Sequence, residues 1–429
     1  MNHSVEWVKN DHLGEQYAKV VHPSGLTVLV CPKKMSTSYA LFATKYGSLE
    51  RTFRKGDEPF VTVPDGIAHF LEHKLFEEED GSDVFSKFAA LGANANAYTS
   101  NELTAYLFST TKNVIESLRV LLDFVTHPYF TKENVQKEQG IIGQEIGMYD
   151  DNPGSRIYYA LLEGLYKKHN VRINIAGTVE TIAEITPELL YQCYNTFYHP
   201  SNMVLSICGN VTVEEVMAVV DEAISPELTP LSISVQYPEE DAEIEREETV
   251  LKMAVAKPLF AFGVKDLSTF KTPLERAKHG ISVTILNKLM FADSSDFYNK
   301  LYDQGLISDS FEAGFDLMRA CAFNAIIGES ETPEAVWQEL CLYLEQIKQE
   351  PPAKEDFERI KRTMYADYIR GFENTESIAS ELMYNAMNGI DYLQYGELIL
   401  SVTYEEIVAL AKHYYENKHF AKAIILPIE

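Results

Sequence analysis

The chain contains little cysteine, and the pattern of its cysteines excludes a small disulfide-stabilised secreted domain. Only five of its 429 residues are cysteines, an odd number at wide spacings. They are Cys31, Cys193, Cys208, Cys321 and Cys341. Disulfide-stabilised domains instead have dense, paired cysteines. We therefore expect reduced thiols in the core of a cytoplasmic protein.

Long apolar runs are also missing from the sequence. No stretch of about 18 consecutive uncharged apolar residues occurs, which is the length that a membrane-spanning helix requires. Residues 1–7 lack the basic start and the following apolar run of a signal peptide. The sequence thus predicts no membrane span and no export signal, which fits a cytoplasmic location.

Basic residues are scarce compared with acidic ones. The chain has 37 Lys and Arg against 64 Asp and Glu, which gives a net charge of -27. Such a field repels nucleic acid and anionic membranes, so it excludes nucleic-acid binding and favours cationic peptides as ligands. The same charge also serves to keep a large protein in solution.

The chain is built from two copies of one plan. Its length and its 46% hydrophobic content predict two or three domains. Short patterns recur about half a chain apart, as in internally repeated proteins. The recurring patterns are Gly66-Ile67 with Gly280-Ile281, Lys74-Leu75 with Lys288-Leu289, and Gly92 with Gly305. We predict an N-terminal domain over residues 1–225 and a homologous C-terminal domain over residues 249–429.

Residues 226–248 separate the two copies. They contain Pro226, Pro230 and Pro238 and end in an acidic run over residues 239–248. A segment of this composition has too few apolar side chains to form a core. We predict that it is an inter-domain linker.

Strand-like and helix-like patterns are grouped within each copy. Apolar β-branched runs at 26–31, 39–44 and 203–208 predict strands, and helical patterns lie between them. This grouping predicts an α+β fold, in which each of two homologous domains is an antiparallel sheet flanked by helices.

A candidate metal-binding helix begins after Gly66. Apolar residues recur at helical spacing over residues 67–78. On such a helix His69 and His73 lie one turn apart, and Glu72 lies beside them. Two neutral imidazoles can hold zinc, and a neighbouring carboxylate can take a proton from water. We therefore predict His69 and His73 as metal ligands and Glu72 as the catalytic base.

A third ligand is needed to complete a catalytic zinc site. The best source is the helical segment 134–148, in which Glu138 and Glu145 share one face. We predict Glu145 as the third ligand and Glu138 as an accessory catalytic carboxylate that acts through a ligand. Glycines at 140, 143 and 147 predict the close approach of another backbone.

The second copy supplies an internal control. Val283, Leu286 and Asn287 stand at the positions that correspond to His69, Glu72 and His73, so only the first copy can hold the metal. The alternative for a histidine pair at this spacing is a purely structural role. The intervening glutamate and the downstream carboxylates favour the metal.

The sequence His69-Phe70-Leu71-Glu72-His73, followed by Glu138 and Glu145, resembles the inverzincin motif of the pitrilysin, insulinase and mitochondrial processing peptidase family. The resemblance covers nearly the whole chain and includes segments 92–99 and 198–203. It is greatest to the short bacterial members that carry the zinc motif.

The resemblance implies a closed active chamber made of four such domains. A two-domain chain must then pair with a second copy of itself or with a homologous chain. It also implies that a substrate peptide adds as a strand beside Asn96, Ala97 and Tyr98. The alternative for that segment is an ordinary strand with asparagines at its turns.

The chain departs from the family pattern in its second half. The family completes its site with an arginine and a tyrosine, and in the matching segment 301–308 this chain has Tyr302 and Ser308 instead. We therefore expect a zinc metalloendopeptidase for peptides or small unfolded polypeptides, which acts as the metal-bearing half of a heterodimer. The alternatives are a zinc-binding scaffold subunit without proteolytic activity and a peptide-binding module without metal.

Overall fold

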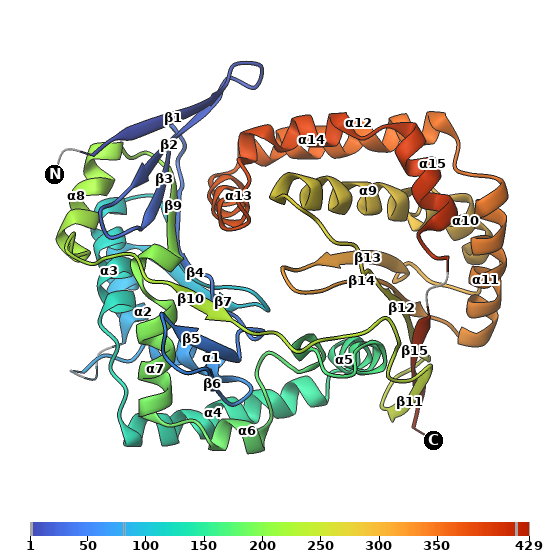
Figure 1. Cartoon of the computed structure of the whole chain (residues 1–429), viewed down its shortest axis with the longest axis horizontal. Coiled ribbons are helices and arrows are strands. Elements are labelled where there is room, and N and C mark those ends of the chain that lie inside the picture. The colour runs from blue at the N-terminus through green and yellow to red at the C-terminus, as the bar shows by residue number, and fades with distance from the viewer. Residues whose placement is uncertain (1–2, 80, 82, 417–418, 429) are drawn as a thin grey trace. The chain divides into compact units, whose positions relative to one another are not determined.

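The computed structural model describes residues 3–79, 81, 83–416 and 419–428. They form two compact units, which are described separately (Figure 1). Unit 1 comprises residues 1–146, 174–237 and 368–395, and unit 2 comprises residues 147–173, 238–367 and 396–429. None of the helices in the described part of the chain combines the length and apolar character needed to cross a bilayer.

Unit 1 contains a seven-stranded sheet with strand order β1-β2-β3-β9-β4-β8-β7. In that order the strands are Val5–Asn10, Glu15–Val21, Thr27–Pro32, Met203–Gly209, Ser38–Thr44, Thr104–Thr110 and Ala93–Thr99. All neighbours are antiparallel except β3 and β9, which run parallel. The sheet was predicted to be antiparallel but is mixed. Parallel strands need a long connection, and the chain between β3 and β9 is long and contains several helices.

Helices cover both faces of this sheet. The helices of unit 1 are α1 (Ile67–Lys74), α2 (Val84–Leu91), α3 (Val114–Thr126), α4 (Lys132–Asp150), α6 (Val179–Ala183), α7 (Pro187–Phe197), α8 (Val213–Ala223) and α13 (Thr375–Met387). Phe42 and Phe108 point from the sheet into the main core, which also contains apolar side chains of α1, α3 and α7. On the opposite face α13 packs against β4 and β9, where Ser206 Oγ donates a hydrogen bond of 2.8 Å to Ala379 O.

Unit 2 contains a five-stranded sheet with strand order β11-β15-β12-β14-β13. These strands are Glu248–Met253, Phe420–Pro427, Leu259–Lys265, Ala322–Glu329 and Glu312–Leu317. The helices are α5 (Pro153–Leu165), α9 (Pro273–Phe291), α10 (Asp296–Asp303), α11 (Pro333–Gln349), α12 (Lys354–Arg370), α14 (Tyr395–Ser401) and α15 (Tyr404–His413). Only β11 and β15 are parallel. A Cβ atom on Gly263 would lie 3.0 Å from Leu161 Cδ2, so this glycine lets α5 approach the sheet closely.

The predicted repeat is present in the order of the elements. The run α1-α2-β7-β8-α3-α4 recurs as α9-α10-β13-β14-α11-α12. The next helices of the two runs, α5 and α13, are placed reciprocally: α5 packs on the sheet of unit 2 and α13 on the sheet of unit 1. The compact units therefore do not follow the predicted boundaries at 225 and 249.

The predicted linker is largely built into the two units. Its first half contains the short strand β10 (Ile233–Val235), which pairs with β5 (Thr52–Lys55) in a three-stranded sheet that also contains β6 (Val61–Thr62). Main-chain pairing of this kind needs no apolar side chains, so composition alone gave no sign of it.

The second half of the predicted linker is held by Glu240. Its carboxylate accepts hydrogen bonds from the main-chain N–H groups of residues 167, 168 and 169 and from Lys265 Nζ, at 2.8–2.9 Å. Burial opposes ionisation of Glu240, but these donors outweigh it and lower the pKa of Glu240 to about 2. The acidic run is therefore not a purely solvated segment.

All five cysteines are free thiols. Cys31 on β3 and Cys208 on β9 are direct neighbours across the parallel pair, although they are far apart in sequence. Both are buried in the sheet of unit 1.

Candidate metal centre

Helix α1 begins at a position that only glycine can occupy. Gly66 has φ 89°, and a Cβ atom on it would lie 2.4 Å from Ala176 O. The helix ends at Lys74, earlier than the predicted residue 78. Phe70 and Leu71 face the core and fix the rotation of the helix, which sends its histidines toward α4.

The three predicted ligands lie together. His69 Nε2 is 3.7 Å from Glu145 Oε1, and His73 Nε2 is 3.6 Å from Glu145 Oε2. Among the described residues, these three side chains are the group of His, Cys, Asp and Glu found close enough to hold one metal ion, with ligand atoms within 4.8 Å of one another. Tetrahedral zinc ligands at 2.0–2.1 Å from the ion are about 3.3 Å apart, so these donors fit a zinc ion with little movement.

The two imidazoles lie in different electrostatic surroundings. Burial and the neighbouring His73 lower the pKa of His69 to about 4, so His69 is neutral at pH 7, as a ligand must be. Burial alone would also lower the pKa of His73, but the hydrogen bond to Glu138 and three nearby carboxylates raise it. The surroundings of His73 thus favour its protonated form more than those of His69 do.

Glu138 contacts the candidate ligand His73 at Nδ1, whereas Glu145 lies near Nε2 of the same ring. Glu138 Oε1 is 3.1 Å from His73 Nδ1, and its Oε2 is 3.6 Å from Lys74 Nζ. Burial opposes ionisation of Glu138, but His73 and Lys74 lower its pKa. By contrast, His69 Nδ1 is buried without a hydrogen-bond partner among the described residues.

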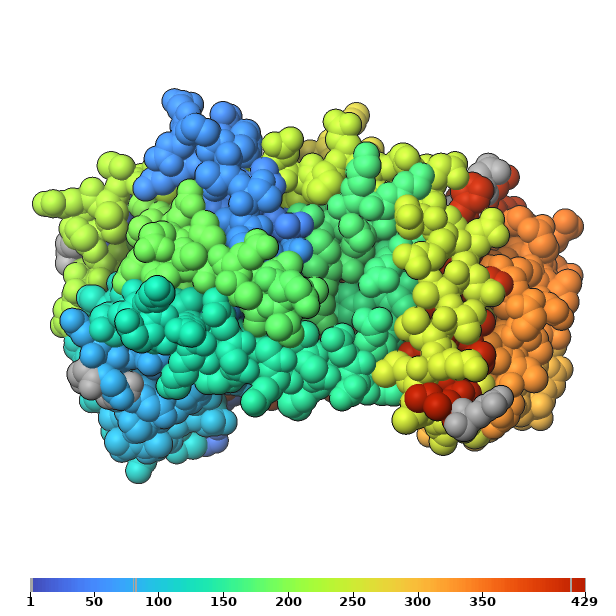
Figure 2. Space-filling model, turned by 90° about the horizontal axis from the view of Figure 1, so that it is seen from below, coloured from blue at the N-terminus to red at the C-terminus, as the bar shows by residue number. Residues whose placement is uncertain are grey.

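Helix α4 provides both glutamates, and its outer surface is open. The turquoise segment that contains α4 lies on the face shown in Figure 2. The glycines of α4 at 140, 143 and 147 have no heavy atom within 4 Å of an added Cβ. The predicted close approach of another backbone is therefore wrong within the described part of the chain.

Glu72 is held by a residue that sequence reasoning missed. Thr99 Oγ1 donates a 2.6 Å hydrogen bond to Glu72 Oε2. Burial raises the pKa of Glu72, and the Thr99 hydrogen bond opposes this effect. The carboxylate is thus fixed at one oxygen. Threonine is common at strand ends, so only the packing of α1 against β7 reveals the contact.

The segment with Asn96, Ala97 and Tyr98 is an edge strand. β7 is the last strand of its sheet and pairs with β8 alone. The Ala97 N–H donates to Asn96 Oδ1 at 2.9 Å, so this amide points away from β8. Tyr98 is 40% exposed. The edge therefore offers main-chain groups to an added strand.

The second copy has no metal site at the matching positions. Val283 and Leu286 are buried in the core of unit 2. Asn287 exchanges side-chain hydrogen bonds of 3.3 and 2.8 Å with Asn324. A reciprocal amide pair thus stands where the first copy has the candidate ligand His73.

Tyr302 and Ser308 occupy the surface of unit 2. Tyr302 is 53% exposed and stacks on Tyr298. Ser308 Oγ lies 2.8 Å from Ser310 Oγ. Neither position supplies a guanidinium group.

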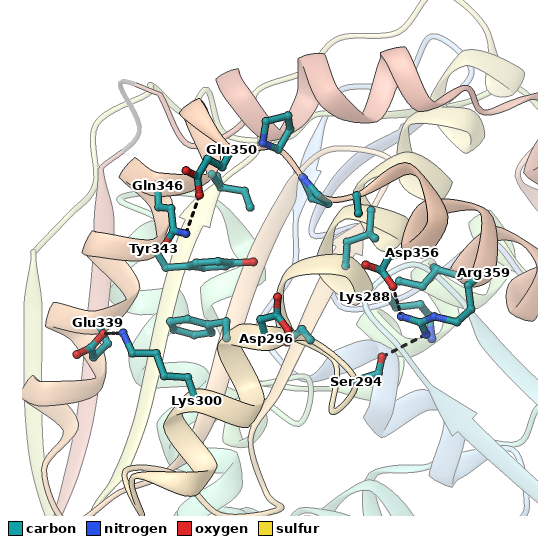
Figure 3. A pocket seen from close by; sticks show the side chains of 18 of the residues that line it. Lys288, Ser294, Asp296, Lys300, Glu339, Tyr343, Gln346, Glu350, Asp356 and Arg359 are labelled. Atoms are coloured by element: carbon teal, nitrogen blue, oxygen red, sulfur yellow. Dashed lines mark hydrogen bonds and ion pairs between the residues drawn. The ribbon is translucent and has the colours of Figure 1, made fainter.

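Unit 2 also contains a pocket of about 530 Å³ between α9, α10, α11 and α12 (Figure 3). Its charged side chains are largely paired with one another, as Lys300 with Glu339 at 2.6 Å and Arg359 with Asp356 at 2.9 Å. The pocket holds no cluster of histidines and carboxylates comparable to that of α1 and α4.

Two family models match the chain. "Insulinase (Peptidase family M16)" matches residues 63–179, and "Peptidase M16 inactive domain" matches residues 184–364. The inactive-domain match includes the part of the chain in which the metal ligands are replaced.

Known proteins are similar over almost the full length. The chain is 42% identical over 388 residues to the "Uncharacterized zinc protease YmfH" of Bacillus subtilis, covering 90% of each protein. An M16-like peptidase from Alicyclobacillus acidocaldarius has a TM-score of 0.90 and 32% identity, and the match covers 100% of this chain and 99% of that one. A protease from Helicobacter pylori shares the fold, with a TM-score of 0.82 and 19% identity over 96% of this chain and 100% of that one. Because family models and a close relative both extend across most of the sequence, the chain belongs to the insulinase family of peptidases, M16.

Proposed function

We propose that the protein is a zinc metalloendopeptidase that cleaves peptides or small unfolded polypeptides. The observation that carries the proposal is the meeting of His69, His73 and Glu145 within 4.8 Å, with the buried carboxylate of Glu72 on the same helix. Two nitrogens and one carboxylate oxygen, with room for a further ligand, form the donor set of catalytic zinc sites. The Bacillus relative is named a zinc protease, which supports the choice of metal.

Zinc held by His69, His73 and Glu145 would polarise water and the substrate carbonyl. Glu72 takes the proton from the attacking water and then donates it to the leaving amine. Its Oε2 accepts the Thr99 hydrogen bond, which leaves Oε1 for the proton. Glu138 does not touch the metal but orients His73 through a hydrogen bond at Nδ1.

The substrate binds as a strand along β7. The outward main-chain groups of Ala97 pair with the peptide, while Asn96 and Tyr98 contribute side-chain contacts at the same edge. Recognition of this kind depends mainly on the peptide backbone. The net charge of -27 favours cationic peptides among possible substrates.

The working enzyme is a dimer, and we favour a heterodimer. Tyr302 and Ser308 do not supply the arginine and tyrosine that the family resemblance implies, so a homologous chain would provide them and close the chamber. The free thiols of all five cysteines fit a cytoplasmic protein.

The test compares purified wild-type protein with Glu72→Gln. Zinc content is measured by mass spectrometry, and cleavage is followed with a quenched basic peptide, with and without a homologous chain that carries the Arg/Tyr pair. We expect about one zinc per chain in both proteins and loss of cleavage in the variant. Glu133→Gln, an exposed change on α4, controls for loss of charge. Full activity of Glu72→Gln would refute the role of Glu72.

The absence of an Arg/Tyr pair also favours a second candidate, a zinc-binding scaffold subunit without proteolytic activity. A scaffold needs no base beside the metal, so the buried Glu72 favours the peptidase. Bound zinc without cleavage under either condition would favour the scaffold.

A further inference from the structure

Lys74, the last residue of α1, is a fully buried lysine beside the metal centre. Its exposed fraction is 0%. Lysine is almost never buried without a paired anion, because desolvation of the ammonium is costly. Anionic side chains around Lys74 should therefore compensate for its burial.

The ammonium lies between two carboxylates. It forms an ion pair with Glu77, one turn further along the chain, and lies 3.6 Å from Glu138 Oε2. The other oxygen of Glu138 contacts His73 Nδ1 at 3.1 Å. Each oxygen of Glu138 thus has one partner, Lys74 on one side and His73 on the other.

We propose that Lys74 is a positioning residue for the metal centre, which anchors Glu138 so that Glu138 fixes the ring of His73. This inference rests on the metal site of the proposed function. Without the anchor, Glu138 is held through one oxygen only and can rotate. It can then leave Nδ1 of His73 or turn toward the metal in competition with Glu145.

The proposal and simple electrostatics make opposite predictions for Lys74→Met. Removal of a nearby positive charge should strengthen the binding of a divalent cation. Loss of a partner that orients a ligand should weaken it, by about 10- to 100-fold in known metal sites. The sign of the change therefore distinguishes positioning from general charge effects.

The experiment measures zinc affinity of the whole chain by competition with a chromophoric chelator, so it needs no cleavage activity. We expect Lys74→Met to bind zinc about 10- to 100-fold more weakly than wild type. Lys137→Met is the matched control, because Lys137 also faces Glu77, at 4.0 Å, but is 67% exposed. It should leave the affinity unchanged.

A double variant tests whether Lys74 affects zinc affinity through Glu138. In a Glu138→Gln background, Lys74→Met should have little further effect on zinc affinity, because both changes remove the same support. The visible spectrum of the cobalt-substituted proteins should change in both single variants, since it reports ligand geometry. Thermal unfolding of the metal-free proteins shows whether Lys74→Met folds. If it does not, Lys74→Gln carries the test, because its neutral amide can still donate to a buried carboxylate but forms no ion pair with Glu138, and it should also weaken zinc binding.

Unchanged or tighter zinc binding by a folded Lys74→Met, or full additivity with Glu138→Gln, would overturn the inference and leave the peptidase proposal intact. A wild-type chain that binds no zinc would refute both. Wild-type zinc binding without cleavage would count only against the peptidase.

Discussion

Replacement of Thr99 by valine should move the pH dependence of peptide cleavage. Glu72 can accept a proton only when it is ionised, so activity falls as the pH drops through its pKa. Burial raises that pKa, and the hydrogen bond from Thr99 opposes the rise by stabilising the ionised form. Thr99→Val removes the opposing effect, so the acid limb of the pH profile should move to higher pH.

The size of the shift follows from the hydrogen bond. A bond to a charged group contributes about 1.5–3 kcal/mol, and the 2.6 Å contact joins a half-buried hydroxyl to a buried carboxylate. The lower part of that range, about 1.5–2 kcal/mol, corresponds to roughly 1–1.5 pKa units. The rates of variant and wild type should converge above the shifted limb, because Thr99 does not itself take the proton.

The assay is kcat/KM for a quenched peptide between pH 5 and 9, with the partner chain present if the reaction needs it. Thr99→Ser keeps the hydroxyl and should retain the wild-type profile. Thr52→Val, which removes an exposed threonine pair with Thr62, controls for the general effect of the substitution. An unshifted acid limb in Thr99→Val would refute the assignment of Thr99, and a uniform loss of rate at all pH values would indicate that it acts on geometry alone.

Three further outcomes are expected. Glu145→Gln should weaken zinc binding by about 100-fold or more in a chelator competition, because a charged ligand becomes neutral. Ala97→Pro should raise KM about fivefold, because the outward N–H can no longer bind a substrate strand, whereas Ala97→Ser keeps that N–H and should leave KM unchanged. Glu240→Gln should lower the free energy of unfolding by about 3 kcal/mol at pH 7 in urea denaturation, since it leaves buried Lys265 with main-chain carbonyls but without its anionic partner. The pKa of Glu240 falls from 4.5 to about 2 on folding, so its contribution is complete above pH 4.5, and the difference between the proteins should shrink as the pH falls toward 2.

The cluster of candidate metal ligands could be predicted from sequence because the arrangement of its residues is local to two helices. The spacing of His69 and His73 fixes their common face, and the face shared by Glu138 and Glu145 is fixed in the same way. Only the meeting of α1 with α4 is tertiary. That meeting is inferred from the need for a third ligand, and the internal repeat serves as a control, because Val283, Leu286 and Asn287 show that only the first copy can hold the metal.

The residues that contact Glu72 and Glu138, namely Thr99 and Lys74, could not be predicted in the same way. Thr99 reaches Glu72 from a strand end, and Lys74 reaches Glu138 from the buried side of α1. A lysine at the end of a helix normally predicts a solvated charge near the negative end of the helix dipole. The two carboxylates that surround it, Glu77 and Glu138, come from outside the helix, so no periodicity within the segment predicts its burial.

The positions of α5 and α13 also could not be predicted from the sequence. The apolar face of α5 (Pro153–Leu165) and that of α13 (Thr375–Met387) indicate that each helix packs on a sheet, but not on which one. In a repeated chain both sheets present similar apolar surfaces, so each helix has two chemically comparable sites. Local contacts decide between them: Gly263 accommodates Leu161 of α5, and Ser206 binds the backbone of α13 at Ala379. Domain boundaries drawn along the sequence therefore fail where a repeat gives one helix two possible sheets.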